Sequence, residues 1–573
     1  MRPISGSSAC PAGARVGTAT AYASRVPALV LGPLLRYVGE ECAHLWVETD
    51  SPCEVEVLGA TQHTFHVAGH HYAVVEMTGL EPGSVHEYEV HLDGAKAWPE
   101  PDSPYPPSRF RTYPKHEALQ VVFGSCRVAA PNHPPYNLPK DHDAEGREID
   151  ALRGLAKRMQ DQPFDDWPDL LLMLGDQVYA DETSPATKEF IRRRRSVDGP
   201  AGEDVLDFEE YTQLYLESWS EPPIRWLLST VSTAMIFDDH DVHDDWNISA
   251  TWLEQMRSGP LWDEHIIGAL MSYWVYQHIG NLRPRDLQTD ELYQRVHELD
   301  DGAPILREFA MKADREPDGT RWSFYRDLGD TRLVVIDSRA GRVLDPGRRS
   351  MLDEAEWKWL EEVATGGFDH LLLATSLPWL LMPALHDLEA ASEAVCDGAW
   401  GRPAAWAGEK VRQAVDLEHW AAFRESFARL GELQRAVGAG ERGEPPATIL
   451  TLSGDVHHAY LNEVAFKRGA GVRSAVYQAV CSPFRNPLDQ KERRIIRSTM
   501  NPLMIAAAKL LRRAAGVPDS EVRWRQVGDG PWFDNQFSTL MIDGRSLLLR
   551  LDKVIGDEDN DTTIEPVLER QLS

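Results

Sequence analysis

Five apolar segments of the chain each end in side chains of the types that bind metal ions. Continuous apolar runs bounded by polar residues are typical of strands buried on both faces, and sheets of such strands bind ligands at the carboxyl ends of the strands. Thiol, phenol, carboxylate and imidazole groups gathered at that edge predict one convergent metal site. The segments are Val121–Cys126, Leu170–Tyr179, Ala234–Asp241, Leu333–Arg339 and Ile449–His458.

The first two segments carry the most specific metal chemistry. Asp176 and Tyr179 lie three residues apart, just beyond an apolar run. A carboxylate can bridge two metals, and a phenolate suits a hard, oxidised ion such as Fe³⁺ rather than Mg²⁺. Cys126 ends the preceding run and is a further candidate ligand, although a lone cysteine is usually a buried, inert residue. We expect all three to bind metal; the alternative is a structural loop with a buried tyrosine.

The third segment is dense in acidic residues and histidine. We expect Asp239 to bind metal and His240 to face the substrate, where it can stabilise or protonate a departing oxygen. Asp241 is expected to orient that imidazole as a hydrogen-bond acceptor. An acidic loop of this kind could equally hold Ca²⁺ through oxygen ligands.

The last two segments complete the predicted site. Asp455 and His457 alternate at a strand end, so their side chains project alike and are expected to bind metal. Arg339 either binds a phosphate oxygen or neutralises Asp337, two residues before it.

Large-scale patterns indicate how these segments are held. With 573 residues, two or more domains are expected. Period-two patterns predict a small β-sandwich of the immunoglobulin or fibronectin type, and the alternation of buried-type strands with helical stretches that follows predicts an α/β part with two sheets packed face to face and helices outside. The predicted parts are a disordered leader (1–29), the β-sandwich (30–113), the α/β domain (118–555) and a C-terminal tail (556–573).

The charge pattern restricts the possible partners. The chain has 59 Lys and Arg against 90 Asp and Glu, a formal net charge of −31, which argues against nucleic-acid binding. Residues 489–514 are instead basic and partly amphipathic, so they form either a weak contact with an anionic membrane surface or a solvated helical insertion. Scattered cysteines and the lack of a recognisable signal-peptide core in residues 1–29 lead us to expect a cytoplasmic protein.

Five blocks in this order resemble the alkaline phosphatase D (PhoD-like) branch of the calcineurin-like metallophosphatases: FGSC, LGDQVY, FDDHD, VVIDSR and SGDVH. The resemblance covers roughly residues 30–555. It implies a two-sheet metallophosphatase sandwich flanked by helices, and a centre containing Fe³⁺ and a divalent ion, often Ca²⁺. By position, Asp176 resembles the bridging ligand and His240 the catalytic histidine. Cys126, Tyr179 and His457 would hold the ferric ion, and Asp239 and Asp455 the divalent ion.

The function that this resemblance implies is hydrolysis of a small-molecule or polymer phosphoester by a hydroxide shared between two metal ions. His240 would assist the leaving group, and Arg339 is the second candidate catalytic residue. One alternative is a phosphodiesterase specific for lipid or polymer diesters. A less favoured one is a non-catalytic scaffold stabilised by calcium.

Overall fold

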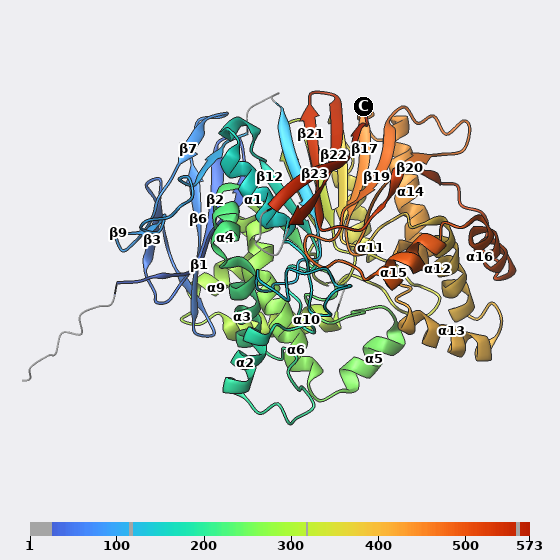
Figure 1. The fold of residues 1–573 in the computed structure, drawn as a ribbon, viewed down its shortest axis with the longest axis horizontal. Helices are drawn as coiled ribbons and strands as arrows, with labels where there is room; N and C mark the ends of the chain where they lie inside the picture. Colours follow the sequence, from blue (N-terminus) through green and yellow to red (C-terminus); the bar gives the residue numbers. More distant parts are fainter. Residues whose placement is uncertain (1–25, 114–117, 317–318, 557–561) are drawn as a thin grey trace, which may run out of the picture.

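The N-terminal part of the chain forms antiparallel sheets, which confirms the β-rich module predicted ahead of the α/β part (Figure 1). The computed structural model describes residues 26–113, 118–316, 319–556 and 562–573. The sheets have the strand orders β1-β2-β6-β5, β4-β3-β8-β9 and β10-β7. Their strands are β1 (Leu29–Val38), β2 (Cys42–Thr49), β3 (Glu54–Val57), β4 (Ala60–His63), β5 (Phe65–Val67), β6 (His70–Thr78), β7 (Val85–Glu87), β8 (Val90–Leu92), β9 (Ala95–Trp98) and β10 (Arg109–Arg111).

One alternating run of this module is divided between two strands in the structure. The alternating run of residues 86–92 contains β7, which pairs with β10, and β8, which pairs with β3. Tyr88 lies between them and is buried, and its hydroxyl donates a hydrogen bond to the carbonyl of Ser229 at 2.5 Å. The tyrosine therefore turns away from the module toward the α/β part, so the chain changes sheets at this point.

The α/β part contains two large sheets, as predicted. One has six strands in the order β13-β12-β11-β21-β22-β23, and the other has seven in the order β14-β15-β16-β17-β19-β18-β20. Strands β11, β12 and β13 are parallel, and so are β15, β16, β17 and β19. The bounds are β11 (Leu119–Gly124), β12 (Leu170–Leu174), β13 (Ser232–Ile236), β14 (Phe324–Leu328), β15 (Thr331–Ile336), β16 (His370–Thr375), β17 (Thr448–Ser453), β18 (Ala459–Ala465), β19 (Ala475–Val480), β20 (Arg523–Trp532), β21 (Gln536–Asp543), β22 (Ser546–Gly556) and β23 (Thr562–Gln571).

Alternate residues of the seven-stranded sheet belong to different cores. Val335 and Leu372 pack into the same core as Phe123 of the six-stranded sheet, whereas Val334 and Leu371 pack into a second core with residues of the flanking helices. Successive side chains of a strand point to opposite faces, so one face of this sheet contacts the other sheet and its second face contacts helices. This arrangement explains why the strands are continuous apolar runs rather than alternating ones.

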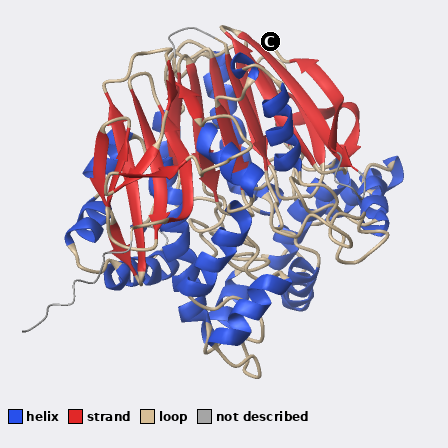
Figure 2. Cartoon of the chain, turned by 60° about the vertical axis from the view of Figure 1, so that its left-hand side comes forward, coloured by secondary structure: helices blue, strands red, loops and turns tan. Residues whose placement is uncertain are grey.

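Helices flank the sheets and gather at the ends of the strands (Figure 2). Helix α6 continues directly into a π-helical turn, η2 (Tyr273–His278). The helices are α1 (Ala151–Asp161), α2 (Pro185–Arg194), α3 (Phe208–Trp219), α4 (Pro222–Thr230), α5 (Ala250–Ser258), α6 (Trp262–Ser272), α7 (Ile279–Asn281), α8 (Pro284–Thr289), α9 (Glu291–Glu298), α10 (Ala303–Arg315), α11 (Glu354–Val363), α12 (Pro383–Cys396), α13 (Arg402–Ala414), α14 (Arg424–Ala439), α15 (Gln490–Ser498) and α16 (Pro502–Ala514). Within the part of the chain that the structure describes, none of them is long and apolar enough to cross a membrane.

The C-terminal prediction requires a correction. Residues 556–573 were expected to form a tail, but β23 pairs antiparallel with β22 and forms the edge of the six-stranded sheet. Ile564, Val567 and Leu568 of β23 are partly buried and pack against the main core. The rest of the strand is polar, so its sequence gives only a weak signal for a strand. The predicted leader lies outside the described residues up to residue 25, and β1 begins at Leu29.

Candidate metal centre

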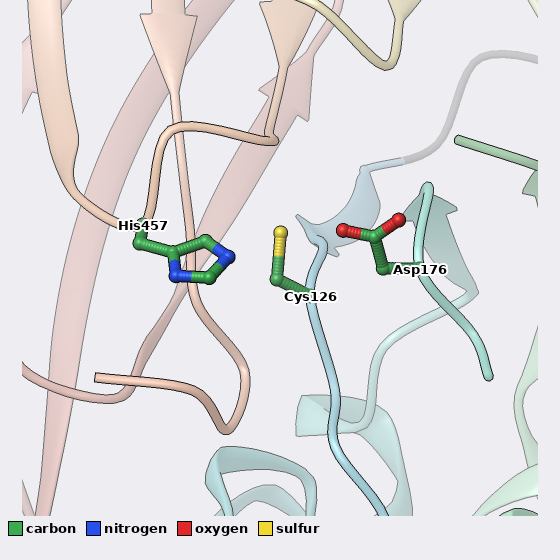
Figure 3. Close-up of side chains that lie close together, drawn as sticks. All are labelled: Cys126, Asp176 and His457. Carbon is green, nitrogen blue, oxygen red and sulfur yellow. The ribbon is translucent and has the colours of Figure 1, made fainter. Parts of the chain in front are cut away.

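The predicted ligands come together where strands of both sheets end. Cys126, Asp176 and His457 follow β11, β12 and β17, and their ligand atoms all lie within 4.8 Å of one another. The His457 ring and the Asp176 carboxylate lie on either side of the Cys126 thiol (Figure 3). The Tyr179 hydroxyl donates a hydrogen bond to Asp176 Oδ2 at 3.4 Å. One carboxylate, one thiol, one imidazole and one phenol therefore share a single site, as predicted.

A second group of carboxylates adjoins the first through Asp176. Oxygens of Asp176, Asp238 and Asp239 lie within 4.8 Å of one another. Asp239 Oδ1 is 3.2 Å from Arg339 Nη2, and Asp455 Oδ1 is 3.7 Å from the same nitrogen. All six residues predicted to bind metal thus gather at one edge, with Asp176 between the two groups.

The backbone at this edge is strained. Among the described residues twelve non-glycine residues have positive φ angles, and four of them are Cys126 (57°), Asp176 (54°), Asp455 (66°) and His457 (53°). L-residues seldom adopt this left-handed conformation, and such strain persists only where the surrounding structure enforces it, typically at functional sites. The four side chains are therefore held in their positions by the turns at the strand ends.

Two glycines allow the strand ends to approach each other. Gly175 has a φ of +105°, and a Cβ atom on it would lie 2.6 Å from Asp238 Cβ. A Cβ atom on Gly454 would overlap the side chain of Ser125, the residue before Cys126. The glycines of the GDQVY and SGDVH blocks are thus required for the close contact between strand ends.

The first group of ligands is buried and surrounded by anions. Burial, together with the Asp176 and Asp455 carboxylates, raises the pKa of Cys126 well above its usual value. Burial and the same Asp176 carboxylate raise the pKa of Tyr179 in the same way. The pKa of Asp176 itself is raised by burial and by neighbouring carboxylates, despite the opposing effect of His240. Because a bound cation favours the deprotonated form of each group, metal binding would have to displace protons here.

Arg339 contacts the carboxylates of the site and not the carboxylate of Asp337. Its guanidinium forms ion pairs with Asp238 and Glu418 and is completely buried. Asp337 instead accepts hydrogen bonds from backbone amides, including those of Arg339 and Gly341. The alternative in which Arg339 neutralises Asp337 is therefore wrong. Its predicted contact with a phosphate oxygen stays a prediction, and full burial argues against it.

His240 is oriented by Asp181, which differs from the predicted arrangement. Its Nδ1 lies 2.9 Å from Asp181 Oδ1, and its ring stacks on Tyr179 with 4.5 Å between the ring centroids. Burial lowers the pKa of His240, but the Asp181 and Asp239 carboxylates outweigh this effect and raise it well above the usual value. Asp181 therefore fixes the imidazole at the edge of the cluster, and the nearby carboxylates favour its protonated form.

Asp241 was predicted to orient His240, but its carboxylate instead accepts hydrogen bonds from the backbone of the site. Its Oδ2 accepts hydrogen bonds from the amides of Asp176 (2.8 Å) and Asp238 (3.0 Å), and its Oδ1 accepts one from Gln277 (3.1 Å). Successive residues after β13 point in different directions, so Asp241 joins the turn after β12 to the turn after β13. Asp181, and not Asp241, is the carboxylate that orients His240.

Other residues of the site lie outside the five strand-end segments and were not predicted from the sequence. His419 lies between Asp455 Oδ2, 3.0 Å from its Nε2, and Glu389 Oε1, 2.7 Å from its Nδ1. Asn486 donates to the Tyr179 hydroxyl at 3.3 Å, and the Ser482 hydroxyl donates to Cys126 Sγ at 3.1 Å. His419 precedes a short helical turn and Glu389 lies in α12, so only the folded chain brings them to the strand ends.

The donor set fits the predicted metal ions. Asp176 Oδ1 and Asp238 Oδ2 are buried and have no hydrogen-bond partner among the described residues. A buried carboxylate oxygen is costly unless it is paired, and a cation bound by these carboxylates would pair both oxygens. Thiolate, phenolate and imidazole ligands suit an oxidised transition metal, and the all-oxygen group suits Ca²⁺.

Comparisons with known proteins show a related family model and a related fold. Residues 154–298 match the family model described as PhoD-like phosphatase, and residues 26–110 match one described as a domain of unknown function, DUF7800. No curated protein matches the chain. A solved structure described as "Structure of PhoD" is 13% identical, with a TM-score of 0.59, and the alignment covers 96% of this chain and 93% of that one. This likeness shows the shared fold.

Two further structures are similar only at a level that supports no conclusion about fold. A cyclomaltodextrinase is 11% identical with a TM-score of 0.15, covering 92% of this chain and 91% of its own. An amylomaltase from Corynebacterium glutamicum is 11% identical with a TM-score of 0.10, covering 75% of this chain and 56% of its own.

The family match, together with the fold, defines the chain as a phosphoesterase, a hydrolase of phosphate esters. The resemblance predicted from the five sequence blocks is confirmed: residues 154–298 match the PhoD-like phosphatase model, and the chain shares the fold of the PhoD structure. As an enzyme it does not fit the alternative of a non-catalytic scaffold.

Proposed function

We propose that the chain hydrolyses phosphoesters at a centre of Fe³⁺ and Ca²⁺ held by the six clustered residues. The ferric ion would be held by Cys126, Tyr179 and His457. The calcium ion would be held by Asp239 and Asp455, and Asp176 would bind both ions. The observation that carries the proposal is the gathering of thiol, imidazole and carboxylate atoms within 4.8 Å, together with the unpartnered oxygen of Asp176. When bound, such ions lower the pKa of a water molecule and polarise the P–O bonds of an ester.

The protein residues themselves supply a proton and orientation. Asp181 holds the Nδ1 of His240 and raises the pKa of the imidazole, so an Nε2 proton would be directed to the leaving oxygen of the ester. The Tyr179 ring against which it stacks restricts the imidazole to one orientation. Arg339 balances the charge of the buried carboxylates, which otherwise repel one another.

Esters with poor leaving groups should depend most on this proton. A phenol or alcohol that leaves as an anion needs protonation more than p-nitrophenol does, so loss of His240 should slow phenyl phosphate more than p-nitrophenyl phosphate. No nucleic-acid substrate is proposed, because the net charge of −31 opposes binding of a polyanion.

The test is metal analysis of the purified protein combined with hydrolysis of p-nitrophenyl phosphate and bis-p-nitrophenyl phosphate. We expect iron and calcium, a purple-brown colour from charge transfer between thiolate or phenolate and iron, and hydrolysis that a chelator abolishes. A preference for the diester would favour the phosphodiesterase form of the proposal, and a preference for the monoester the phosphatase form. A metal-loaded protein that cleaves neither ester would overturn it.

A further inference from the structure

Helix α16 presents an apolar face to solvent. Leu503 and Leu510, seven residues apart, are 80% and 70% exposed, and Met504 and Leu511 are 44% and 39% exposed. Residues at this spacing lie on one side of a helix, and alanines occupy three of the six positions between Leu503 and Leu510. A surface helix normally has the opposite polarity, so this face suits a partner that accepts apolar side chains.

The opposite face of α16 is firmly attached to the protein. Ala508 and Arg512 are buried, and Arg512 Nε lies 2.7 Å from Asp387 Oδ1 in α12. Trp400 Nε1 donates a hydrogen bond to the carbonyl of Ala514 at 3.0 Å, next to the end of the helix. The helix lies at one side of the molecule beside α12, with α15 close by (Figure 1). Its apolar side chains therefore project outward from a fixed support.

Helices α15 and α16 also carry cations. Residues 489–514 contain seven Lys or Arg and two Asp or Glu, in a chain whose net charge is −31. Three of the seven, Arg493, Arg512 and Arg513, pair with acidic residues outside this segment. Lys491, Arg494, Arg497 and Lys509 are exposed and form no ion pair with any other described residue, and Ile495 between them is 58% exposed. Apolar side chains bordered by cations are the pattern of a helix that lies in the interface of an anionic bilayer.

We propose that α15 and α16 form a docking surface for an anionic lipid bilayer, into which Leu503 and Leu510 insert. A second copy of the chain suits the surface less well, because two such faces would bring Lys509 and its neighbouring cations against like charges. An anionic bilayer satisfies both features at once, since its head groups pair with the cations and its acyl region accepts the leucines. The docking does not depend on the proposed catalysis.

The surface is directly connected to the metal centre. Asn486, whose side chain donates to the Tyr179 hydroxyl, lies four residues before α15. Met500 lies between the two helices, and Val456 lies between Asp455 and His457. Both side chains pack against the same buried residues, Met382, Tyr460 and Val480. Docking would therefore hold the loops of the site close to the bilayer surface.

The experiment is sedimentation of the full chain with vesicles of phosphatidylcholine alone or mixed equally with phosphatidylglycerol, at low and high salt. We expect binding to the anionic vesicles only, weakened by salt, and a loss of about tenfold or more in affinity for the Leu503→Glu/Leu510→Glu variant. The matched control is Val85→Glu/Leu299→Glu, which makes the same change at two side chains that are 49% and 45% exposed elsewhere. This control should bind like the wild type.

Three results would overturn the proposal. The wild type could fail to sediment with anionic vesicles, or the helix variant could sediment as well as the control variant. Dimerisation of the wild type in analytical ultracentrifugation that the helix variant lacks, without vesicle binding, would identify a second copy as the occupant. Circular dichroism and hydrolysis of p-nitrophenyl phosphate in solution, both expected to be unchanged in the helix variant, distinguish lost docking from misfolding and from failure of the proposed catalysis.

Discussion

Replacement of Asp181 by asparagine tests how the protein maintains a proton on His240. The carboxylate accepts at Oδ1, 2.9 Å from His240 Nδ1, and at Oδ2 from the backbone amide of Asp244 at 2.7 Å. Asparagine keeps one acceptor oxygen for these two donors and carries no charge. The Asp181→Asn variant should therefore weaken the charged form of the imidazole without removing the imidazole itself.

The size of the effect follows from the environment of the pair. The two side chains are 17% and 16% exposed, so solvent screens their interaction only partly. A hydrogen bond to a charged group contributes about 1.5–3 kcal/mol, and about 1.4 kcal/mol corresponds to one pH unit. Since the proton donor is active below its pKa, activity falls as pH rises through that pKa. A lower pKa of His240 in the Asp181→Asn variant should therefore move the alkaline limb of the kcat/KM profile to lower pH, by about 1–2 pH units.

The assay is the pH profile of kcat/KM for phenyl phosphate, with p-nitrophenyl phosphate as the less demanding leaving group. Asp244→Asn is the matched control, because Asp244 Oδ1 is 3.9 Å from His240 Nε2 and its side chain is 63% exposed. Because the Asp244 carboxylate is exposed and more distant, its loss should move the limb by only a few tenths of a pH unit. An unchanged alkaline limb in Asp181→Asn with intact metal content, or equal shifts in both variants, would refute the assignment of His240 as a proton donor controlled by Asp181.

Three further predictions follow from the contacts around the site. Gly454→Ala should lower the free energy of unfolding, measured in urea, by about 1–3 kcal/mol, because the added Cβ overlaps the adjoining strand end. The control Gly199→Ala, whose Cβ meets nothing within 4 Å, should change this free energy little. Equal free energies of unfolding for the two variants would contradict the close contact. Metal content after dialysis should decrease as pH falls, because the raised pKa of Cys126 lets protons compete with metal; constant content across acidic pH would contradict this. His419→Gln should weaken calcium binding about 10- to 100-fold by loosening Asp455, and an unchanged Kd in calorimetry would remove His419 from that role.

Much of the site could be predicted because its ligands belong to the strands themselves. A buried parallel strand has a recognisable apolar run, and its carboxyl end has a known place in the sheet, so Cys126, Asp176 and Asp455 could be located by their position alone. The glycines beside the last two were part of the same signal. These features also carried the prediction of two packed sheets.

The residues that escaped prediction depend on contacts between distant segments. His419 and Glu389 reach Asp455 from helical segments whose orientation no local pattern specifies. Asp181 and Asp241 are two carboxylates at similar distances from a strand end, and only the folded turns determine that the first contacts His240. The edge strand β23 was missed because a polar edge strand lacks the apolar run of a central strand.

Metal analysis of the Asp176→Asn variant tests the central claim most directly. Asp176 is the residue whose oxygens reach both groups of ligands, so the variant should lose iron and calcium together, and with them nearly all turnover of both chromogenic esters. Circular dichroism should show that it is folded. A folded Asp176→Asn variant that retains both metals and the activity of the wild type would contradict the account.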